Sequence, residues 1–329
     1  MSVAITLVTW NGASHIGSCL ESLTTQRQPA QVVFLVDNAS ADDTLFIAET
    51  YRCRLAVLGT NLVILRNGKN LGFTRAANIG LRQAMSFEPR PDIITLLNQD
   101  TLLDSGWLEA LQDVFVRRPE AGGVGCKIFY PGRATLQHAG GFLAWPRLTG
   151  LHYGHHQPDT PEHNVEREVD FVTGAAIAMR TAALEQVGLL NEIFSPGYYE
   201  DVELCMRLKA HGWRIFYCPR AVLEHAESAS FSDPLTRLAL SQRNRLLFAL
   251  TYMGDVSFRR EFELAEVAFL SSDVHPDERR ALSLAYGQAM LMAKRALSAI
   301  NGCPPTSFET VHAAIDLFAR LRHACIDSF

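Results

Sequence analysis

The sequence predicts an α/β fold in which helices cover both faces of a parallel β-sheet. Over the first third of the chain, short apolar runs alternate with longer segments whose apolar residues recur at helical spacing. The short runs are apolar almost throughout, as is typical of strands that are buried on both faces. Such alternation is typical of parallel sheets with crossover helices, in which ligands bind at the carboxyl ends of the strands.

Apolar, β-branched runs mark the expected strands of this sheet. The four clearest are residues 3–9, 31–37, 61–67 and 92–98. Helices are expected where apolar residues recur every three or four positions. These helices are residues 74–85, residues 104–118 and a first segment with Ile16, Leu20 and Leu23 on one face. Asp104 or Ser105 is expected to cap the helix at 104–118.

The alternation becomes less regular after Arg118. Residues 122–130 and 137–145 predict short strands or a hairpin, and the polar residues 146–168, rich in Pro and His, predict a long loop. Three further elements are expected: a strand-like run at 169–180 that contains Gly174, a helix at 200–212 ended by Gly212, and a strand at 213–218. From Pro234 onward the pattern is almost wholly helical.

Composition and charge argue against several classes of protein. The 329 residues are 48% hydrophobic and 20% charged, which is ordinary for a globular chain, and a formal net charge of -5 gives no indication of nucleic-acid binding. The N-terminal apolar run is too short for a signal peptide, and no run reaches the roughly 20 residues that span a bilayer. The seven cysteines lack CxxC spacing, which predicts reduced, mostly buried thiols in a cytoplasmic protein.

Polar residues follow the predicted strands at the edge of the sheet where ligands are expected. They are Thr9 and Asn11 after the first strand, Asp37 after the second, and Asn98 and Asp100 after the fourth. Asp37 could cap the next helix, or it could accept hydrogen bonds from a nucleoside. Asp100 could cap a turn, or it could bind a divalent cation, because Mg²⁺ and Mn²⁺ prefer oxygen ligands and often share them with a diphosphate.

Further candidates lie elsewhere in the chain. Glu200 and Asp201 begin a predicted helix, where they could interact with the helix dipole or where one could act as a general base. The preceding segment SPGYY suits the wall of a pocket. His225 could be a structural residue or a ligand, and Arg75 and Arg243 could each hold a phosphate or be solvated.

Two other patterns point away from particular sites. His152, His155 and His156 have a spacing that a metal could use, but no carboxylate or thiol accompanies them, so we expect solvated loop residues. The phosphate-binding patterns GxGxxG and GxxxxGK[ST] are absent, which argues against dehydrogenases and P-loop enzymes.

Taken in order, these segments resemble glycosyltransferase family 2, whose members have the GT-A fold. The resemblance extends over roughly residues 1–250 and is greatest to the rhamnosyltransferase-like branch. The segments that carry it are VTWN (8–11), VDNASADDT (36–44), NLGFTRAANIGL (70–81), LLNQDT (96–101), FVTGAAIAMR (171–180), GYYEDVELCMRLKAHGW (197–213) and HAESAS (225–230).

The resemblance implies an inverting transferase that uses a nucleotide-diphosphate sugar and Mn²⁺ or Mg²⁺, on a Rossmann-like, mostly parallel sheet. It implies that Asp37 contacts the nucleoside and that Asp100, the last residue of the family's DxD motif, binds the metal. Asp201 would be the general base of the ED motif, with Glu200 beside it, and His225 would complete the metal site or touch the diphosphate. The implied donor-binding segments contain Thr9, Asn11, Arg75, Asn78, Asn98 and Arg243.

One residue departs from the family pattern. Asn98 stands at the first position of the DxD motif, so the metal would have one carboxylate from this motif and not two. An NxD variant is similar to what many rhamnosyltransferase-like members show, and we expect an active enzyme.

The function implied by the resemblance is transfer of a deoxyhexose such as rhamnose from a dTDP- or UDP-sugar to a saccharide or polyprenyl-linked acceptor. Polysaccharide and cell-envelope biosynthesis is the expected setting, with the protein cytoplasmic or peripheral at the inner face of the membrane. A sugar-phosphate nucleotidyltransferase and a non-catalytic GT-A-like binding protein are the alternatives. The single glycine of TWNGASH argues against the first, and Asn98 is the feature that hints at the second.

The resemblance and the helical pattern predict two domains. Residues 1–232 would form the catalytic domain, with a donor-binding half at about 1–118 and an acceptor-side half at about 119–232, and residues 233–329 would form a helical region. Residues 233–254 could form a basic amphipathic helix that lies on a membrane, although packing on the catalytic domain is the preferred interpretation. Apolar faces of the later helices could form a homodimer. The residues proposed for a dimer are Leu282, Ala285, Ala289 and Met292, or Ile315, Phe318 and Leu321.

Overall fold

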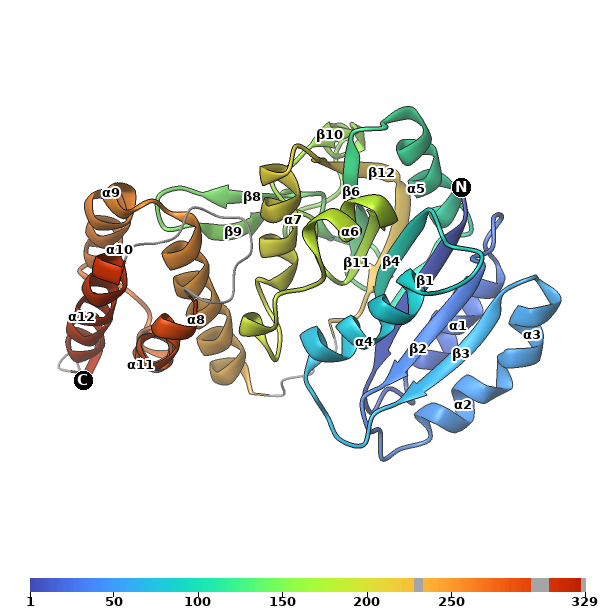
Figure 1. The fold of residues 1–329 in the computed structure, drawn as a ribbon, viewed down its shortest axis with the longest axis horizontal. Coiled ribbons are helices and arrows are strands. Elements are labelled where there is room, and N and C mark those ends of the chain that lie inside the picture. The colour runs from blue at the N-terminus through green and yellow to red at the C-terminus, as the bar shows by residue number, and fades with distance from the viewer. Residues whose placement is uncertain (228–232, 297–307, 327–329) are drawn as a thin grey trace. The chain divides into compact units, whose positions relative to one another are not determined.

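The protein is built around a mixed β-sheet, as the computed structural model in Figure 1 shows. The structure describes residues 1–227, 233–296 and 308–326. Contacts divide the chain into two compact units. The sheet unit comprises Met1–Phe142, Leu151–Leu190 and Glu200–Ser228, and the helical unit comprises Leu143–Gly150, Asn191–Tyr199 and Ala229–Phe329. The predicted boundary between residues 232 and 233 adjoins residues 228–232, which lie outside the described part of the chain, as do the last residues of the HAESAS segment.

The first four long strands are parallel, as the sequence predicts. β1 (Val3–Thr9) lies between β2 (Val32–Asp37) and β4 (Ile93–Asn98), and β3 (Asn61–Arg66) pairs with the outer side of β2. Each begins and ends within one residue of its predicted bounds. Because all four run in one direction, their polar carboxyl ends meet at one edge of the sheet.

The other strands make the sheet mixed. β11 (Ala176–Arg180) is antiparallel to both β4 and β6 (Ala121–Phe129), and β12 (Arg214–His225) runs parallel to β6. The remaining strands of this sheet are short: β5 (Thr101–Leu103) and β10 (Arg167–Glu168) pair with β12, and β7 (Leu136–His138) pairs antiparallel with β6. A separate two-stranded sheet consists of β8 (Gly141–Ala144) and β9 (Thr149–His152). The sheet is therefore mostly parallel with an antiparallel insertion.

Helices cover both faces of the sheet. On one face, α1 (Ile16–Thr24) and α5 (Trp107–Arg117) contribute to a core that contains Ile5, Leu7 and Leu35. On the other face, α4 (Phe73–Met85) approaches so closely that a Cβ on Gly80 would lie 2.4 Å from the Thr6 side chain. The remaining helices of this unit are α2 (Thr44–Thr50), α3 (Arg52–Val57), α6 (Thr181–Val187) and α7 (Glu200–Ala210).

The predicted cap of α5 is wrong. Gly106 is the N-cap residue, and no side chain caps the helix. Asp104 is engaged elsewhere, because its carboxylate forms an ion pair with Arg133 at 2.6 Å. Its backbone carbonyl still accepts a hydrogen bond from the Trp107 N–H at 3.0 Å.

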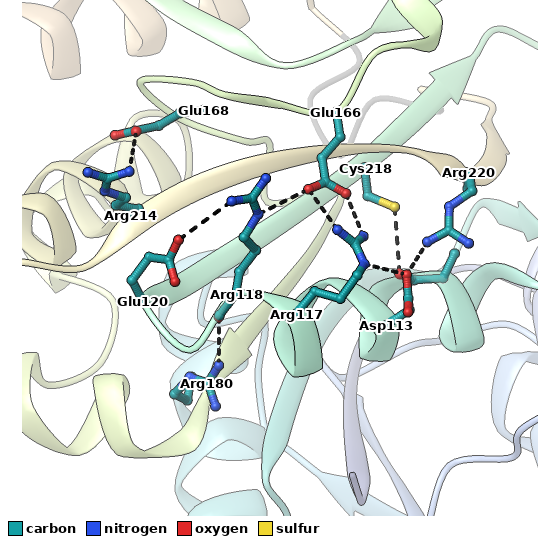
Figure 2. Close-up of polar contacts among 11 residues, drawn as sticks. Asp113, Arg117, Arg118, Glu120, Glu166, Glu168, Arg180, Arg214, Cys218 and Arg220 are labelled. Atoms are coloured by element: carbon teal, nitrogen blue, oxygen red, sulfur yellow. Dashed lines mark hydrogen bonds and ion pairs between the residues drawn. The ribbon is translucent and has the colours of Figure 1, made fainter.

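The polar segment predicted as one long loop contains β9, β10 and a 3₁₀ turn at Pro161–Asn164. Two sets of charges hold it. Nζ of Lys127, which is buried in β6, lies 2.7 Å from the Asp159 carboxylate and also bonds Asn164. Glu166 pairs with Arg117 at 2.6 Å and Arg118 at 3.4 Å, in the network of Figure 2. Burial of a lysine in the sheet thus orders a segment whose composition indicated a loop.

The strand expected at 169–180 is also shorter than predicted, since only β11 is extended. Residues 173–175 form a turn, from which the Ala175 carbonyl accepts a hydrogen bond from the Asn98 N–H at 2.9 Å. Gly174 in this turn donates its N–H to Asp201. The apolar residues before this turn are buried but do not belong to a long strand.

The helical unit confirms the pattern seen from Pro234 onward. Asp233 caps α8, because its carboxylate accepts hydrogen bonds from Leu235 and Thr236 N–H groups. The unit consists of α8 (Pro234–Tyr252), α9 (Asp255–Ser257), a π-helical turn at Phe258–Phe262, α10 (Glu263–Leu270), α11 (Pro276–Ala296) and α12 (Phe308–Ile326). No described helix is both long enough and apolar enough to span a membrane.

The apolar residues proposed for a dimer are largely buried within this unit. Leu282, Ala285 and Ala289 of α11 and Phe318 of α12 have no exposed surface, and Leu321 is 5% exposed. Because α11 packs against α8 and α12, these side chains stabilise the unit itself. All described cysteines are free, and only Cys53 among them is exposed, while Cys303 lies outside the described residues.

Candidate active site

The carboxyl ends of three parallel strands form the floor of the candidate site. Thr9 lies opposite Asp37 in the β1–β2 pair, and Val8 lies opposite Asn98 in the β1–β4 pair. Asp37 is buried, and its carboxylate accepts hydrogen bonds from the Ser40 N–H at 3.2 and 3.3 Å. Asp37 thus forms a turn with Ser40 and does not cap α2, whose N-cap residue is Asp43, and each of its oxygens keeps a lone pair for a ligand.

Gln99 fixes the turn that follows β4, and sequence patterns did not single it out. Its Oε1 accepts hydrogen bonds from the Thr9 hydroxyl and from the Trp10 N–H at 3.0 Å, and its Nε2 donates to the Trp10 carbonyl. A Cβ on Gly12 would lie 2.0 Å from Oε1, so only glycine leaves room for this amide. Thr9 is buried, and its hydroxyl is committed to Gln99.

Asp100, Asn98 and His225 converge beside this turn. The His225 Nε2 atom lies 3.1 Å from Oδ1 of Asp100 and 3.4 Å from Nδ2 of Asn98. β12 brings the histidine here by pairing with β5, where His225 lies opposite Thr101. Both His225 and the side chain of Asp100 are buried.

These side chains suit a divalent cation that is shared with a ligand. Nδ1 of His225 lies 2.7 Å from Oε1 of Gln137, which can accept a hydrogen bond from it, and a neutral ring protonated at Nδ1 has a lone pair on Nε2. A lone pair 3.1 Å from a carboxylate repels it unless a proton or a cation intervenes. Within the described ranges no three His, Cys, Asp or Glu residues cluster to hold a metal, so further ligands would have to be oxygens of a bound diphosphate.

Glu200 and Asp201 begin α7 near the same edge. The Asp201 oxygens accept hydrogen bonds from the N–H groups of Gly174 at 2.7 Å and Val202 at 2.8 Å. Since Asn98 bonds the adjacent Ala175, the 173–175 turn connects the Asp201 carboxylate to the end of β4. The structure thus brings Asp201 and the Asn98–Asp100 turn together.

Burial raises the pKa of both carboxyl groups, and the charge of Asp201 raises the pKa of Glu200 further. Backbone hydrogen bonds oppose the rise at Asp201. Glu200 is 5% exposed, and its Oε2 has no hydrogen-bond partner among the described residues. Asp201 is the more exposed of the two and the better able to reach a substrate.

Comparison with known proteins identifies the family. A sequence model described as Glycosyltransferase like family 2 matches residues 2–249. The chain belongs to glycosyltransferase family 2. It is 30% identical over 268 residues to the N-acetylglucosaminyl-diphospho-decaprenol L-rhamnosyltransferase of Mycobacterium tuberculosis, a match that covers 74% of this chain and 82% of the relative.

Solved structures show that this glycosyltransferase has the predicted GT-A fold. Residues 1–349 of S. aureus TarS in complex with UDP-GlcNAc align with a TM-score of 0.55 at 17% identity, covering 100% of this chain and 92% of that one. GalNAc-T7 with UDP, GalNAc and Mn²⁺ aligns with a TM-score of 0.60 at 14% identity, covering 94% of this chain and 59% of that one.

Three expected donor-binding residues of the glycosyltransferase lie in the loop after β1 (Asn11) and in α4 (Arg75 and Asn78). Oδ1 of Asn11 accepts a hydrogen bond from the Ala41 N–H at 2.8 Å, which ties together the loops after β1 and β2. Asn78 is buried, and its amide bonds the N–H and the carbonyl of Leu190. Arg75 is exposed in the first turn of α4. Asn78 therefore fixes the backbone at Leu190, whereas Arg75 is accessible to a ligand.

Asn38 organises the loop before α4 and was not recognised from the sequence. Its Nδ2 donates to Asn70 at 2.8 Å, and its Oδ1 accepts from the Leu71 N–H at 2.9 Å and from Asn67 at 3.1 Å. The signal that could have indicated this network was the occurrence of asparagines in two turn-rich segments, Asn38 in one and Asn67 and Asn70 in the other.

Arg243 belongs to the helical unit of the glycosyltransferase. It lies in α8 and donates to the Ser195 carbonyl and to Oδ1 of Asn244, each at 2.8 Å. Burial lowers the pKa of its guanidinium. Its contact with donor phosphates stays a prediction.

The histidines of the 146–168 segment differ from one another. His155 and His156 are exposed, as expected, and both bond the Tyr130 hydroxyl. His152 is not a solvated loop residue, because it lies in β9 with its Nδ1 3.0 Å from Nδ1 of His138. Burial, together with His155, lowers its pKa to about 4. The pairing of β9 with β8 and the packing of His152 against Phe171 account for the difference.

Proposed function

We propose that this glycosyltransferase moves a deoxyhexose, with L-rhamnose the leading candidate, from a dTDP- or UDP-linked donor to a hydroxyl of a lipid-linked saccharide. The name of the mycobacterial relative supports this choice of sugar and acceptor. The observation that carries the proposed chemistry is the link between Asp201 and the end of β4, through which a proton acceptor and a candidate diphosphate site share one edge of the sheet.

Asp201 is proposed as the general base. An acceptor hydroxyl is a weak nucleophile, so a carboxylate must take its proton as the oxygen attacks the anomeric carbon. Two hydrogen bonds from backbone N–H groups orient the Asp201 carboxylate and leave it lone pairs for that proton. Attack on the face opposite the diphosphate forms the new glycosidic bond, breaks the bond to the diphosphate and inverts the anomeric carbon.

Asp100 and His225, together with the amide of Asn98, are the residues that would hold Mn²⁺ or Mg²⁺. Such an ion, when bound, stabilises as a Lewis acid the negative charge that develops on the departing diphosphate. Asp37, Asn11 and Arg75 are proposed to contact the donor directly. Thr9 and Asn78, being buried and bonded to other parts of the protein, are proposed to position those residues.

The Asp201→Asn variant tests the proposed base. Loss of a general base slows transfer by about 10²–10⁴-fold, whereas donor binding should persist because the amide keeps the size of the carboxylate. Transfer would be measured by mass spectrometry with dTDP-rhamnose and a lipid-linked N-acetylglucosamine acceptor, and donor binding by thermal shift with Mn²⁺. Asp273→Asn, at an exposed carboxylate of the helical unit, is the control.

Three results would contradict the proposal. Transfer by Asp201→Asn at the wild-type rate would exclude Asp201 as the base. Release of pyrophosphate from a nucleoside triphosphate and a sugar phosphate would favour a nucleotidyltransferase. Absence of both transfer and donor hydrolysis by the wild-type protein with Mn²⁺ would favour a non-catalytic binding protein.

A lipid-linked acceptor would require contact with the inner face of the membrane, and we propose the helical unit for it. Val256 and Leu264 are exposed by 65% and 66%, and Arg259 and Arg260 are exposed between them. Apolar side chains beside basic ones suit a surface of anionic lipid. When vesicles containing phosphatidylglycerol are sedimented, the wild-type protein should be found in the vesicle pellet and the Leu264→Glu variant in the supernatant. Equal recovery of both would contradict this role.

A further inference from the structure

We propose that Gln137 is a positioning residue that fixes the tautomer of His225, so that the Nε2 lone pair faces Asp100 and is available to a divalent cation. This inference rests on the proposed function, in which that cation accompanies the donor diphosphate. Gln137 belongs to β7, outside every segment that carries the family resemblance.

The orientation of the Gln137 amide follows from its two neighbours. Oε1 lies 2.7 Å from Nδ1 of His225, and Nε2 lies 3.4 Å from the Glu227 carboxylate. A carboxylate accepts hydrogen bonds and cannot donate them, so the amide NH₂ belongs on the Glu227 side. In the opposite orientation of the amide, the carbonyl oxygen of Gln137 would face an oxygen of the Glu227 carboxylate, and neither could donate a hydrogen bond. The carbonyl oxygen of Gln137 therefore faces His225.

This orientation determines where the imidazole proton lies. Because a carbonyl oxygen only accepts, Nδ1 of His225 must carry the proton. In the neutral ring Nε2 then holds a lone pair, and the Asn98 amide at 3.4 Å lies on that side. Nε2 also lies 3.1 Å from Oδ1 of Asp100, so the lone pair of this tautomer faces the carboxylate. A cation bound by both His225 Nε2 and the Asp100 carboxylate would replace the repulsion between them by attraction of each to the cation.

Gln137 is itself held firmly. It is 7% exposed, and β7 pairs with β6 through its neighbours Leu136 and His138. On the other side, Leu136 exchanges hydrogen bonds with Gln157 and His156, each at 2.8 Å. His152 forms a hydrogen bond with the Gln137 backbone. A side chain on a strand that is bonded on both edges has little freedom to leave His225.

The arrangement has the form of an outer partner of a metal-binding histidine. Such partners accept the N–H that the ligand does not use, and this bond fixes the tautomer and the orientation of the ring. Their loss typically weakens metal binding by about 10–100-fold. We expect this effect in a residue that touches neither the sugar nor the nucleotide.

Two variants separate the hydrogen bond from the packing. Gln137→Met keeps the length of the side chain but removes the strong acceptor. Gln137→Glu keeps an acceptor for Nδ1 and is always combined with Glu227→Gln, so that the new carboxylate does not face that of Glu227. Gln288→Met, at an exposed position of α11, is the control for the introduced methionine. Thermal denaturation of each full-length variant would verify folding.

The first measurement is the tautomer of His225 in the metal-free protein. With ¹⁵N-labelled histidine at pH 8, long-range ¹⁵N–¹H correlation should show the proton on Nδ1 in the wild type and in Gln137→Glu, and a shift toward Nε2 in Gln137→Met. The signal is assigned by its loss in His225→Gln. A proton that stays on Nδ1 in folded Gln137→Met would overturn the inference, and so would a wild-type ring that carries a proton on Nε2, whether or not Nδ1 is also protonated.

The second measurement is Mn²⁺ affinity in the presence of UDP, by electron paramagnetic resonance. Gln137→Met should bind Mn²⁺ about 10–100-fold more weakly than the wild type, and Gln137→Glu should restore most of the affinity. Unchanged affinity in Gln137→Met would overturn the inference while leaving the proposed function intact. Failure of the wild type to bind Mn²⁺ would contradict the metal site of the proposed function, even if the tautomer responds as expected.

Discussion

At the scale of single residues, Glu200 illustrates a cost that a candidate catalytic site imposes on stability. The carboxyl group is buried, and its Oε2 lacks a partner among the described residues. Burial and the neighbouring Asp201 raise its pKa well above the usual 4.5. A folded-state pKa above the unfolded one means that the folded protein binds more protons, so the free energy of unfolding falls as pH rises through this interval.

The Glu200→Gln variant should therefore be more stable than the wild type at pH 8 but not at pH 4. At pH 8 the wild type must either bury a negative charge at Glu200 or keep this carboxyl group protonated against the solution pH, and glutamine removes both costs. We expect the free energy of unfolding to rise by about 1–3 kcal/mol at pH 8, the usual scale for an unsatisfied buried group. Chemical denaturation at both pH values measures it. Glu162→Gln, at a side chain that is 73% exposed, should change little at either pH. An equal effect at both pH values would contradict the assigned pKa direction.

At the scale of elements, one buried lysine orders the segment between β9 and β10. The Lys127 side chain is 3% exposed, whereas its partner Asp159 is 28% exposed. The two charges are thus desolvated to different degrees. Removing the aspartate leaves a buried charge with a single neutral partner, Asn164, but removing the lysine leaves a carboxylate that water can still reach.

We expect Asp159→Ala to destabilise the protein more than Lys127→Met does. An uncompensated buried charge costs about 3–5 kcal/mol, whereas replacing the lysine by an apolar side chain of similar length should cost less. Both variants should increase hydrogen exchange in residues 153–166, because each removes an anchor of that segment. Equal destabilisation by the two variants would show that Lys127 is hydrated in solution.

At the scale of the whole molecule, an ion cluster joins distant parts of the chain within the helical unit. Glu266 of α10 has no exposed surface and pairs with Arg147 at 2.7 Å and with Arg245 of α8. Burial acts to raise the pKa of Glu266, but the two guanidinium groups outweigh it and lower the pKa. The stability from this carboxylate is present above its unfolded pKa and is lost as pH falls through the folded one.

Glu266→Gln should be among the most destabilising single changes in the helical unit. It leaves two arginines without a counter-charge, which costs about 3–5 kcal/mol near neutral pH and less below pH 4. Glu263→Gln breaks the exposed pair with Arg320 and should cost no more than about 1 kcal/mol. Denaturant titrations at pH 7 and pH 3.5 compare the two. A cost for Glu266→Gln that does not depend on pH would contradict the pairing.

The sequence predicted those elements of the sheet unit that a local signal identifies, either apolar residues throughout a strand or apolar residues on one face of a helix. The strands at residues 3–9 and 92–98 are recognisable because both of their faces are buried, and α4 because its small and apolar residues share one face. The cap of α5 and the short β11 were predicted wrongly, since Asp104 is drawn to Arg133 and residues 173–175 turn to meet Asn98 and Asp201. Those contacts join residues far apart in the chain.

Local patterning by itself thus determined the α/β class, the parallel first half, the helical C-terminal region and the candidate acids Asp37, Asp100 and Asp201. Strand burial and helical periodicity are properties of neighbouring residues, so they can be read from one segment at a time. Only the tertiary structure decided that Gln99 braces the turn after β4, that Gln137 bonds His225, and that Leu143–Gly150 and Asn191–Tyr199 join the helical unit. Hydrogen bonds between distant segments depend on the folded path of the chain, and no local pattern encodes them.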